Sequence, residues 1–382
     1  MKKKPFLVLS TFLFFFLLLC ITACNKDGHN PGRPGGTDGA TTITTPVSLG
    51  LYAVQDTTNS GKLFIKTVRI GDKDKVIPLS FDTGSAGISL LAENIFPSSM
   101  VDVNGFKFKS GQDTIQYEGI TITNLQAKKS YGSDATLRTE YGNIGYATIA
   151  VGDTHGAVKM QTMPIFFYYT VTGDVGSKPV MGTFGVNTAN NGAKELPDTT
   201  QIFPLVSPLK YLHYGNSTIA GYKLGLVNLG GCDTASSQGC TLLTIGLTPN
   251  DESSYTLNPL DADPNLVTTQ SGYPAYPSYN VFNPGIPRCI VTDSVSTNSD
   301  TYVLLDTGNP TASVNITKPA NNSKADSIKV ITPSNIILSY NFRTIGYQTK
   351  FNAGNPRTAL GIYFFTKFNF LEDYQKGVVG LN

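Results

Sequence analysis

The tripeptide Asp-Thr-Gly occurs twice in this chain of 382 residues, at positions 82–84 and 306–308. Each copy ends a short apolar run, 77–81 before the first and 302–305 before the second. Runs of this length, rich in β-prone residues and closed by a glycine turn, predict buried strands. One copy could arise by chance at average composition, but two copies in matching surroundings indicate two similar halves that face each other.

A pair of carboxyl groups at Asp82 and Asp306 has a specific chemical use. Two carboxylates held a few ångströms apart cannot both ionise cheaply, so they share one proton, and one acts as a base while the other acts as an acid. The base takes a proton from water as the water attacks a peptide carbonyl, and the acid polarises that carbonyl. This chemistry requires no metal, no other cofactor and no covalent intermediate. The alternative is two ordinary strand-end turns, because Asp, Thr and Gly all favour turns.

The residues that follow the two aspartates fit the same chemistry. Gly84 and Gly308 let the backbone turn tightly. Thr83 and Thr307 carry hydroxyls that can hydrogen-bond across to the opposite half and hold the carboxylates coplanar. We therefore take the two aspartates as candidate catalytic residues and these four residues as their supporting loops.

The composition predicts an all-β protein with many turns. The chain contains 38 Gly and 22 Pro, is 40% hydrophobic and only 15% charged, and is long enough for two cores of ordinary domain size. It has no long amphipathic helix pattern. Further short strands are predicted at 63–70, 147–151, 328–331 and 336–340.

Residues 1–23 read as a targeting segment rather than as part of the fold. Three lysines at 2–4 precede an apolar run at 6–19, and the quartet 21–24 resembles the bacterial lipobox. That resemblance implies cleavage before Cys24 and diacylation of Cys24, so that lipid anchors the mature chain. The alternative, an uncleaved transmembrane helix, needs about 20 apolar residues, more than this run provides. Asn25 follows the cysteine, which favours the outer membrane of a bacterial cell envelope.

The next segment, residues 24–46, is rich in Gly, Pro, Thr and Asn and has almost nothing to bury. We expect a flexible tether with an average reach of about 25 Å, although it could simply be disordered without purpose. Removing the three signal lysines from the formal net charge of +2 leaves −1, since 2 − 3 = −1. A near-neutral chain without basic clusters predicts no nucleic-acid partner.

The cysteines agree with export. Cys20 lies in the signal and Cys24 is the lipidated residue, so three cysteines remain. Cys232 and Cys240 flank a loop rich in Gly, Ser and Asp that is short enough to close as a disulfide, and Cys289 is left without a predicted partner. A metal site is disfavoured, because the three histidines are widely scattered and no Cys or His pair has ligand spacing.

The two motifs and the segments around them resemble the pepsin-like aspartic peptidases, which are bilobal all-β enzymes with one catalytic Asp from each lobe. The resemblance implies a double barrel with pseudo-twofold symmetry, with lobes at 47–205 and 206–382 and a cleft between them. It also implies that an extended peptide or protein substrate lies across this cleft, and we expect a monomer. Islands of likeness cover most of residues 50–382: an opening strand at 63–71, a flap tip at 130–133, its return strand at 144–152, apolar-apolar-Gly elements at 180–182 and 359–361, and closing strands at 363–381.

The chain also departs from the family pattern. In the family, the hydroxyl at the position of Ser85 bonds the outer oxygen of the first catalytic carboxylate. The second loop has Asn309 at this place, whose amide can still donate. There is no Trp, so the Tyr-Trp hydrogen bond behind the flap cannot form. The flap tyrosine is either Tyr131 or Tyr141.

Two hypotheses on function follow. The first is an exported, lipid-anchored aspartic endopeptidase that acts best at acidic pH. The second is a catalytically inactive pepsin-like surface lipoprotein that serves as a binding or structural module. Asn309, the missing tryptophan and the uncertain flap tyrosine favour it, the first loop also resembles that of bacterial exported lipoproteins with this fold, and a fold alone does not confer a reaction. Other hydrolase motifs, such as Gly-x-Ser-x-Gly and His-Glu-x-x-His, are absent from the sequence.

Overall fold

The computed structural model describes most of the chain from residue 39 onward. The described ranges are 39–54, 62–132, 137–153, 156–173, 182–188, 192–200, 202–229, 239–263, 282–292, 297–309, 312–315, 327–341, 349–351 and 357–382. These residues all lie within one of the two compact units of the chain, which spans 37–268 and 276–382. The predicted signal segment, Cys24, most of the tether and Cys232 lie outside the described residues.

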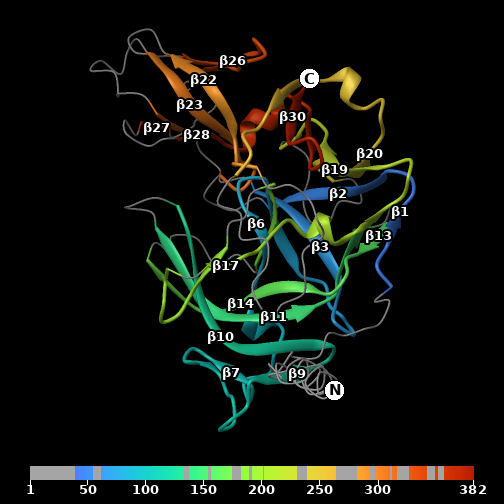
Figure 1. Cartoon of the computed structure of the whole chain (residues 1–382), viewed down its shortest axis with the longest axis vertical. Coiled ribbons are helices and arrows are strands. Elements are labelled where there is room, and N and C mark those ends of the chain that lie inside the picture. The colour runs from blue at the N-terminus through green and yellow to red at the C-terminus, as the bar shows by residue number, and fades with distance from the viewer. Residues whose placement is uncertain are drawn as a thin grey trace, which may run out of the picture. The chain divides into compact units, whose positions relative to one another are not determined.

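The protein is all-β, as predicted. Most strands join one closed, barrel-like sheet in which β10, β11 and β14 lie side by side (Figure 1). From the first half, this sheet contains β2 (Val47–Val54), β3 (Lys62–Ile70), β4 (Lys73–Asp74), β5 (Pro78–Asp82), β6 (Ala86–Leu91), β9 (Thr114–Tyr117), β10 (Ile120–Tyr131), β11 (Arg138–Ala147), β12 (Ile149–Asp153), β13 (Gly156–Lys159), β14 (Met163–Gly173), β15 (Gly182–Val186), β16 (Ala193–Glu195) and β17 (Ile202–Phe203). From the second half it contains β19 (Ile219–Leu224), β20 (Thr241–Leu247), β21 (Thr256–Pro259), β29 (Phe370–Asp373) and β30 (Val378–Leu381).

The remaining described strands form three smaller sheets. A seven-stranded sheet comprises β22 (Ile286–Thr292), β23 (Thr297–Leu305), β24 (Ala312–Val314), β25 (Ser327–Ile331), β26 (Ile337–Asn341), β27 (Thr349–Phe351) and β28 (Arg357–Leu360). Two short pairs are β1 (Thr42–Ile43) with β18 (His213–Tyr214), and β7 (Val101–Asp102) with β8 (Gly105–Phe106). The described helices are single 3₁₀ turns, η1 (Ala92–Asn94), η3 (Pro208–Tyr211), η4 (Glu252–Ser254) and η5 (Ile362–Thr366). Within the described ranges, no helix has the length and apolar character needed to cross a bilayer.

The predicted boundary between residues 205 and 206 is not a break in hydrogen bonding. Strand β2 pairs antiparallel with β3 of the first half and also with β20 of the second half. An eight-residue strand can do this because its two ends use different partners, with Tyr52 opposite Phe64 and Leu49 opposite Leu243. The two halves therefore share one sheet.

Each Asp-Thr-Gly motif lies at the end of a buried strand flanked by a parallel neighbour. Strand β5 runs beside β15, with Phe81 opposite Phe184 and Asp82 opposite Gly185. Strand β23 runs beside β28 in the same way, with Leu305 opposite Leu360. Both runs were visible in the sequence because they are apolar: β5 is buried at 79–81, and in β23 the half-buried residues 302 and 304 are apolar as well as the buried residues 303 and 305.

This register corrects one expectation. The sequence predicts that 180–182 is the apolar-apolar-Gly element under the first Asp loop, but the glycine beside Asp82 is Gly185, three residues later. A Cβ on Gly185 would lie 2.7 Å from the carbonyl carbon of Ser85, so the close approach of the two strands requires glycine here. The second element, 359–361, lies where it was predicted.

The hairpin formed by β10 and β11 differs from the return strand predicted from the sequence. The predicted return strand, 144–152, is divided between the end of β11 and β12, and the strand that returns from Tyr131 begins earlier, at Arg138. Tyr131 pairs with Arg138, and Tyr141 lies across from Lys128. The pairing of the two strands therefore extends to Tyr131 and Arg138.

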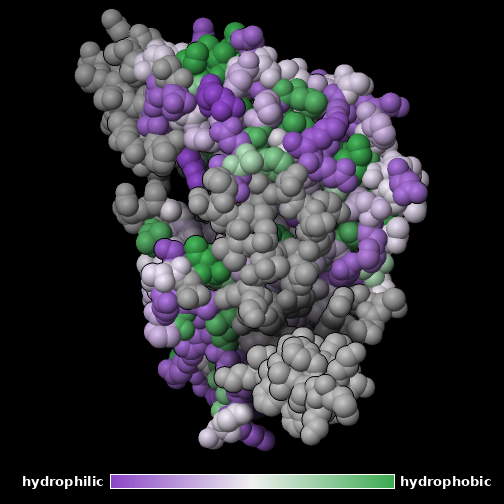
Figure 2. Space-filling view, viewed as in Figure 1, coloured by the Kyte–Doolittle hydropathy of each residue, from purple (hydrophilic) through white to green (hydrophobic). Residues whose placement is uncertain are grey.

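The surface carries few large apolar side chains. The exposed ones among the described residues are Val76, Val103, Leu137, Ile202, Leu226, Leu242 and Ile337. On the face in Figure 2, the hydrophobic residues drawn in colour form small separate groups among hydrophilic ones. Scattered apolar residues of this kind are normal on a soluble surface and do not mark an interface.

Candidate active site

The structure brings Asp82 and Asp306 together. A Cβ on Gly84 would lie 2.4 Å from the carboxyl carbon of Asp306, and a Cβ on Gly308 would lie 2.6 Å from the carboxyl carbon of Asp82. Each glycine therefore lies directly against the carboxyl group from the opposite loop, where no side chain fits. A hydrogen bond also links the two carboxyl groups.

Four reciprocal hydrogen bonds lock the two loops together. The hydroxyl of Thr83 donates to the carbonyl of Leu305 at 2.7 Å and accepts from the N–H of Thr307 at 3.0 Å. The hydroxyl of Thr307 donates to the carbonyl of Phe81 at 2.7 Å and accepts from the N–H of Thr83 at 3.1 Å. The near equality of the two sets of distances shows that the loops are related as a symmetric pair.

The first carboxyl group is held by donors from its own loop. The N–H of Gly84 donates to Oδ1 of Asp82 at 2.7 Å, and the hydroxyl of Ser85 donates to Oδ2 at 2.8 Å. The sequence analysis expected this second bond. Hydrogen bonds donated to a carboxylate favour its charged form.

The second carboxyl group also accepts two hydrogen bonds from its own loop, both from backbone N–H groups. The N–H of Gly308 donates to Oδ1 of Asp306 at 2.9 Å, and the backbone N–H of Asn309 also bonds this carboxyl group. Burial raises the pKa of Asp306 well above its ordinary value, and the charge of Asp82 and the hydrogen bond from Asp82 raise it further. The two backbone donors oppose these effects without overcoming them. The pair therefore keeps a proton at a pH at which an isolated aspartate would be ionised.

Accessibility separates the residues that could meet a substrate from those that brace them. Both aspartates are partly exposed, whereas Thr83 is 2% exposed and Thr307 is fully buried. Behind the first loop, the side chain of Asn187 donates to the carbonyl of Thr83 at 2.8 Å, and its N–H donates to the carbonyl of Ser85 at 2.9 Å. The sequence analysis missed Asn187, which lies just beyond β15, because the contact spans 104 residues of chain.

The structure distinguishes the two candidate flap tyrosines. The hydroxyl of Tyr131 lies 3.1 Å from that of Ser89 in β6, the strand that follows the first Asp loop. A serine thus takes the part that the family gives to a tryptophan. Tyr131 also interacts electrostatically with Asp82, and its own pKa is raised well above the ordinary value, chiefly by burial. Tyr141 lies farther along the returning strand. The geometry therefore favours Tyr131.

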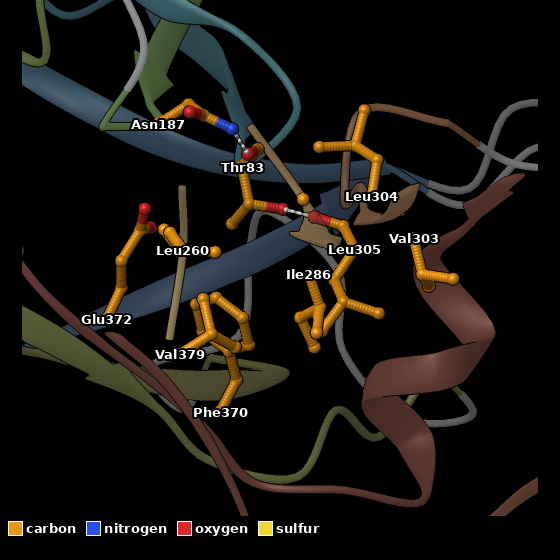
Figure 3. A pocket seen from close by; sticks show the side chains of 11 residues that line it. Thr83, Asn187, Leu260, Ile286, Val303, Leu304, Leu305, Phe370, Glu372 and Val379 are labelled. Carbon is orange, nitrogen blue, oxygen red and sulfur yellow. Dashed lines mark hydrogen bonds between the residues drawn. The ribbon is translucent and has the colours of Figure 1, made fainter. Parts of the chain in front are cut away.

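A small cavity borders the first Asp loop at Thr83 and the strand before the second Asp loop at Leu305 (Figure 3). Neither aspartate lines it. Its polar lining consists of Thr83, Asn187 and Glu372, and its other lining residues are Leu260, Gly285, Ile286, Val303, Leu304, Leu305, Phe370 and Val379. In Figure 3, the bonds from Asn187 to Thr83 and from Thr83 to Leu305 cross this region. The cavity is part of the support of the loops and not the place where a peptide would meet the carboxyl groups.

Glu372 is an unusual member of that support because it is a buried carboxyl group. It is 3% exposed, and burial raises its pKa to about 7. The hydroxyl of Tyr222 donates to Oε2 at 2.7 Å, the N–H of Thr188 donates to Oε1 at 3.2 Å, and Lys210 interacts with it electrostatically. These three partners favour the charged form but do not offset the cost of burial.

The remaining sequence predictions concern the cysteines and metal binding. Cys240 is disulfide-bonded, and its predicted partner Cys232 lies outside the described residues. Cys289 is a free, buried thiol, and burial raises its pKa to about 12. Within the described ranges, no group of three or more His, Cys, Asp or Glu side chains is placed to hold a metal ion.

Comparison with known proteins supports the fold and leaves the function open. The all-β architecture is that of the pepsin-like aspartic proteinases. Among the solved structures that match, the crystal structure of the aspartic proteinase from Irpex lacteus has a TM-score of 0.52 at 15% identity, over 88% of this chain and 97% of that chain. No family model and no curated protein sequence matches the chain. At this identity, the similarity establishes the fold alone.

Proposed function

We propose that the protein is an aspartic endopeptidase that hydrolyses peptide bonds with water activated by Asp82 and Asp306. The observation that carries this proposal is the reciprocal bonding of the two Asp-Thr-Gly loops, which holds two partly exposed carboxyl groups within hydrogen-bonding range of each other. A pair built only as ordinary turns would not need glycine to lie against the opposite carboxyl group on both sides.

The differing environments assign roles within the dyad. Asp82, which accepts bonds from Gly84 and Ser85, is the carboxylate that takes a proton from water. Asp306 holds the shared proton and donates it toward the oxygen of the scissile carbonyl as the water attacks. In the second step, the proton on Asp82 passes to the leaving amine, and Asp306 recovers its proton as the new carboxyl group forms. The proton balance of the dyad is thereby restored.

The substrate class follows from the hairpin. Tyr131 stands near the dyad at the end of β10, so an extended peptide held by backbone hydrogen bonds would lie between this hairpin and the carboxyl groups. The noncatalytic alternative drew support from the missing tryptophan. The bond between Tyr131 and Ser89 removes that reason, since the tyrosine is anchored without a tryptophan.

Location is a separate part of the proposal. The basic and apolar start of the chain and the lipobox-like quartet at 21–24 support lipidation of Cys24 and an outer-membrane anchor in a bacterial cell envelope, with the enzyme acting as a monomer. Mass spectrometry of the membrane-extracted protein tests the anchor. A diacylglycerol on an N-terminal Cys24 is expected, and an unmodified chain that still begins at Met1 would contradict it.

Activity is tested with a mixed peptide library. Purified protein is incubated with the library from pH 3 to 7, with and without pepstatin, beside Asp82→Asn, Asp306→Asn and the control Asp74→Asn. Asp74 forms a surface ion pair with Arg69 and is 79% exposed, so its substitution leaves the dyad intact. We expect pepstatin-sensitive cleavage that both dyad variants lose and the control keeps. No cleavage by the wild-type protein at any pH would favour the binding module.

A further inference from the structure

A buried pair of opposite charges lies inside the β10–β11 hairpin, which the peptidase chemistry described above does not use. Lys129 and Glu140 are direct partners in the register of the two strands, and they are 5% and 3% exposed. A buried charged side chain is costly unless it is paired, and apolar residues of similar volume would often be as stable. The pair therefore has a reason other than stability.

The lysine connects the hairpin to the first Asp loop. Its Nζ donates to the carbonyl of Ala86 at 3.0 Å, the residue at which β6 begins directly after the loop. The same ammonium lies 5.1 Å from the centre of the Tyr131 ring, within the range of a cation–π contact. Lys129 thus touches both the flap tyrosine and the strand that leaves the catalytic loop.

The charge of the lysine reaches the dyad. Lys129 interacts electrostatically with Glu140 and also with Asp82. Burial lowers the pKa of Lys129 to about 8, so the side chain is still charged at neutral and acidic pH. Glu140 has a second cationic partner, because Arg138 bonds its Oε1 at 2.8 Å. Burial raises the pKa of Glu140, so at acidic pH this carboxyl group offsets the charge of Lys129 even less.

We propose that Lys129 is a positioning residue of the dyad, whose ammonium group ties the flap hairpin to the first catalytic loop and acts electrostatically on Asp82. The kinetic consequence of this inference rests on the proposed peptidase function, whereas the electrostatic coupling between Lys129 and Asp82 does not depend on it. The ammonium is too buried to contact a substrate, so it acts through Asp82 and Tyr131.

Other charged and titratable groups face the same region and must be counted. Asp306 faces Asp82 from the second loop, Tyr131 faces it from β10, and Tyr222 faces it from β19. The carboxyl group of Asp306 is proton-bound and the two phenols are neutral at acidic pH, because burial raises the pKa of each tyrosine. Lys129 supplies a positive charge that acts on Asp82.

The test compares the pH profiles of kcat/KM for the wild type, Lys129→Gln, Lys129→Met, Lys129→Arg and Glu140→Gln. Lys129→Gln keeps a donor for the Ala86 carbonyl without the charge, and Glu140 remains paired with Arg138 in all three Lys129 variants. We expect both neutral variants to lose activity on the acid side at a pH higher by about 0.5 to 1 unit, because the ionised carboxylate is no longer stabilised. Lys129→Arg should restore the wild-type acid limb, and Glu140→Gln should not move it upward.

A merely structural role would lower kcat in the neutral variants while leaving the acid limb within about 0.2 pH unit of the wild type, and that result would overturn the inference. If Lys129→Met does not fold, Lys129→Gln decides the question. A second readout does not depend on cleavage: carbon-13 NMR of labelled aspartate carboxyls follows the ionisation steps of the dyad in the wild type and in Lys129→Gln. If the protein cleaves no peptide but the lower ionisation step of the dyad still lies at a higher pH in Lys129→Gln than in the wild type, the peptidase proposal is refuted and the inference about Lys129 stands. An unmoved step would refute the inference, whether or not the protein cleaves peptides.

Discussion

The hydroxyl groups of Thr83 and Thr307 give a prediction whose size can be worked out bond by bond. In Thr83→Val, a methyl group replaces the hydroxyl with nearly the same shape, so the packing is kept. The substitution leaves the carbonyl of Leu305 and the N–H of Thr307 without their partner, and both residues are buried. Each unsatisfied buried group costs about 1–3 kcal/mol, so the expected loss for the two groups is about 2–6 kcal/mol of unfolding free energy.

Symmetry sharpens this prediction. Thr307→Val breaks one donated bond of 2.7 Å and one accepted bond of 3.1 Å, compared with 2.7 and 3.0 Å for Thr83→Val. The two variants should therefore lose the same free energy to within about 0.5 kcal/mol. Thr67→Val is a matched control within the first half. The buried hydroxyl of Thr67 donates to the carbonyl of Lys75 at 2.8 Å, with the carbonyl of Ile77 as a second acceptor at 3.2 Å, and it accepts from the N–H of Ile77 at 2.9 Å.

The assay combines stability with activity. Urea unfolding followed by circular dichroism is suitable, since the chain has no tryptophan to report fluorescence. All three variants should be destabilised, but only Thr83→Val and Thr307→Val should lose peptidase activity, by about 100-fold or more, because they release the loops that align the carboxyl groups. The reasoning is refuted if Thr83→Val unfolds within about 0.5 kcal/mol of the wild type, or if the control loses as much activity as the loop variants.

Three further predictions follow from single residues. Burial raises the pKa of Glu372 from 4.5 to about 7, so the contribution of this residue to stability is complete below pH 4.5 and is lost as the pH rises toward 7, by up to about 3 kcal/mol. Urea unfolding at several pH values should show that Glu372→Gln has a flatter dependence of unfolding free energy on pH. An equal slope in both proteins would contradict the assignment. Gly84→Ala places a methyl group against the carboxyl group of Asp306 and should abolish peptide cleavage while the circular dichroism spectrum stays unchanged; retained activity would disprove the close contact. Cys289 should resist maleimide at pH 8 in the native protein and react once urea unfolds it, because its pKa is about 12, so rapid native labelling would count against its burial.

The sequence was sufficient for the features that depend on local pattern. The strands that end at Asp82 and Asp306 were predictable because buried apolar runs that stop at glycine need no information from elsewhere in the chain. The strand at 63–70 was predictable for the same reason and corresponds to β3. The bond between Ser85 and Asp82 was also within reach, since the two residues are three positions apart.

Features that depend on distant pairing could not be predicted in the same way. Both Gly182 and Gly185 follow an apolar residue, and only the parallel register with β5 decides which one lies beside Asp82. The contact between Tyr131 and Ser89 spans 42 residues, and the contact between Lys129 and Ala86 spans 43. A lysine in a strand reads as an exposed residue from sequence alone, because lysines are almost never fully buried. Its burial depends on Glu140 from the returning strand.

The central claim is that two carboxyl groups from distant parts of the chain share one proton. Carbon-13 NMR titration of Asp306 in the wild-type protein and in Asp82→Asn tests this most directly. The account predicts that Asp306 titrates well above its ordinary range in the wild type and at clearly lower pH in the variant, because the variant removes the charge of Asp82. Identical titration of Asp306 in the two proteins would show that the carboxyl groups do not interact, and the account would fail.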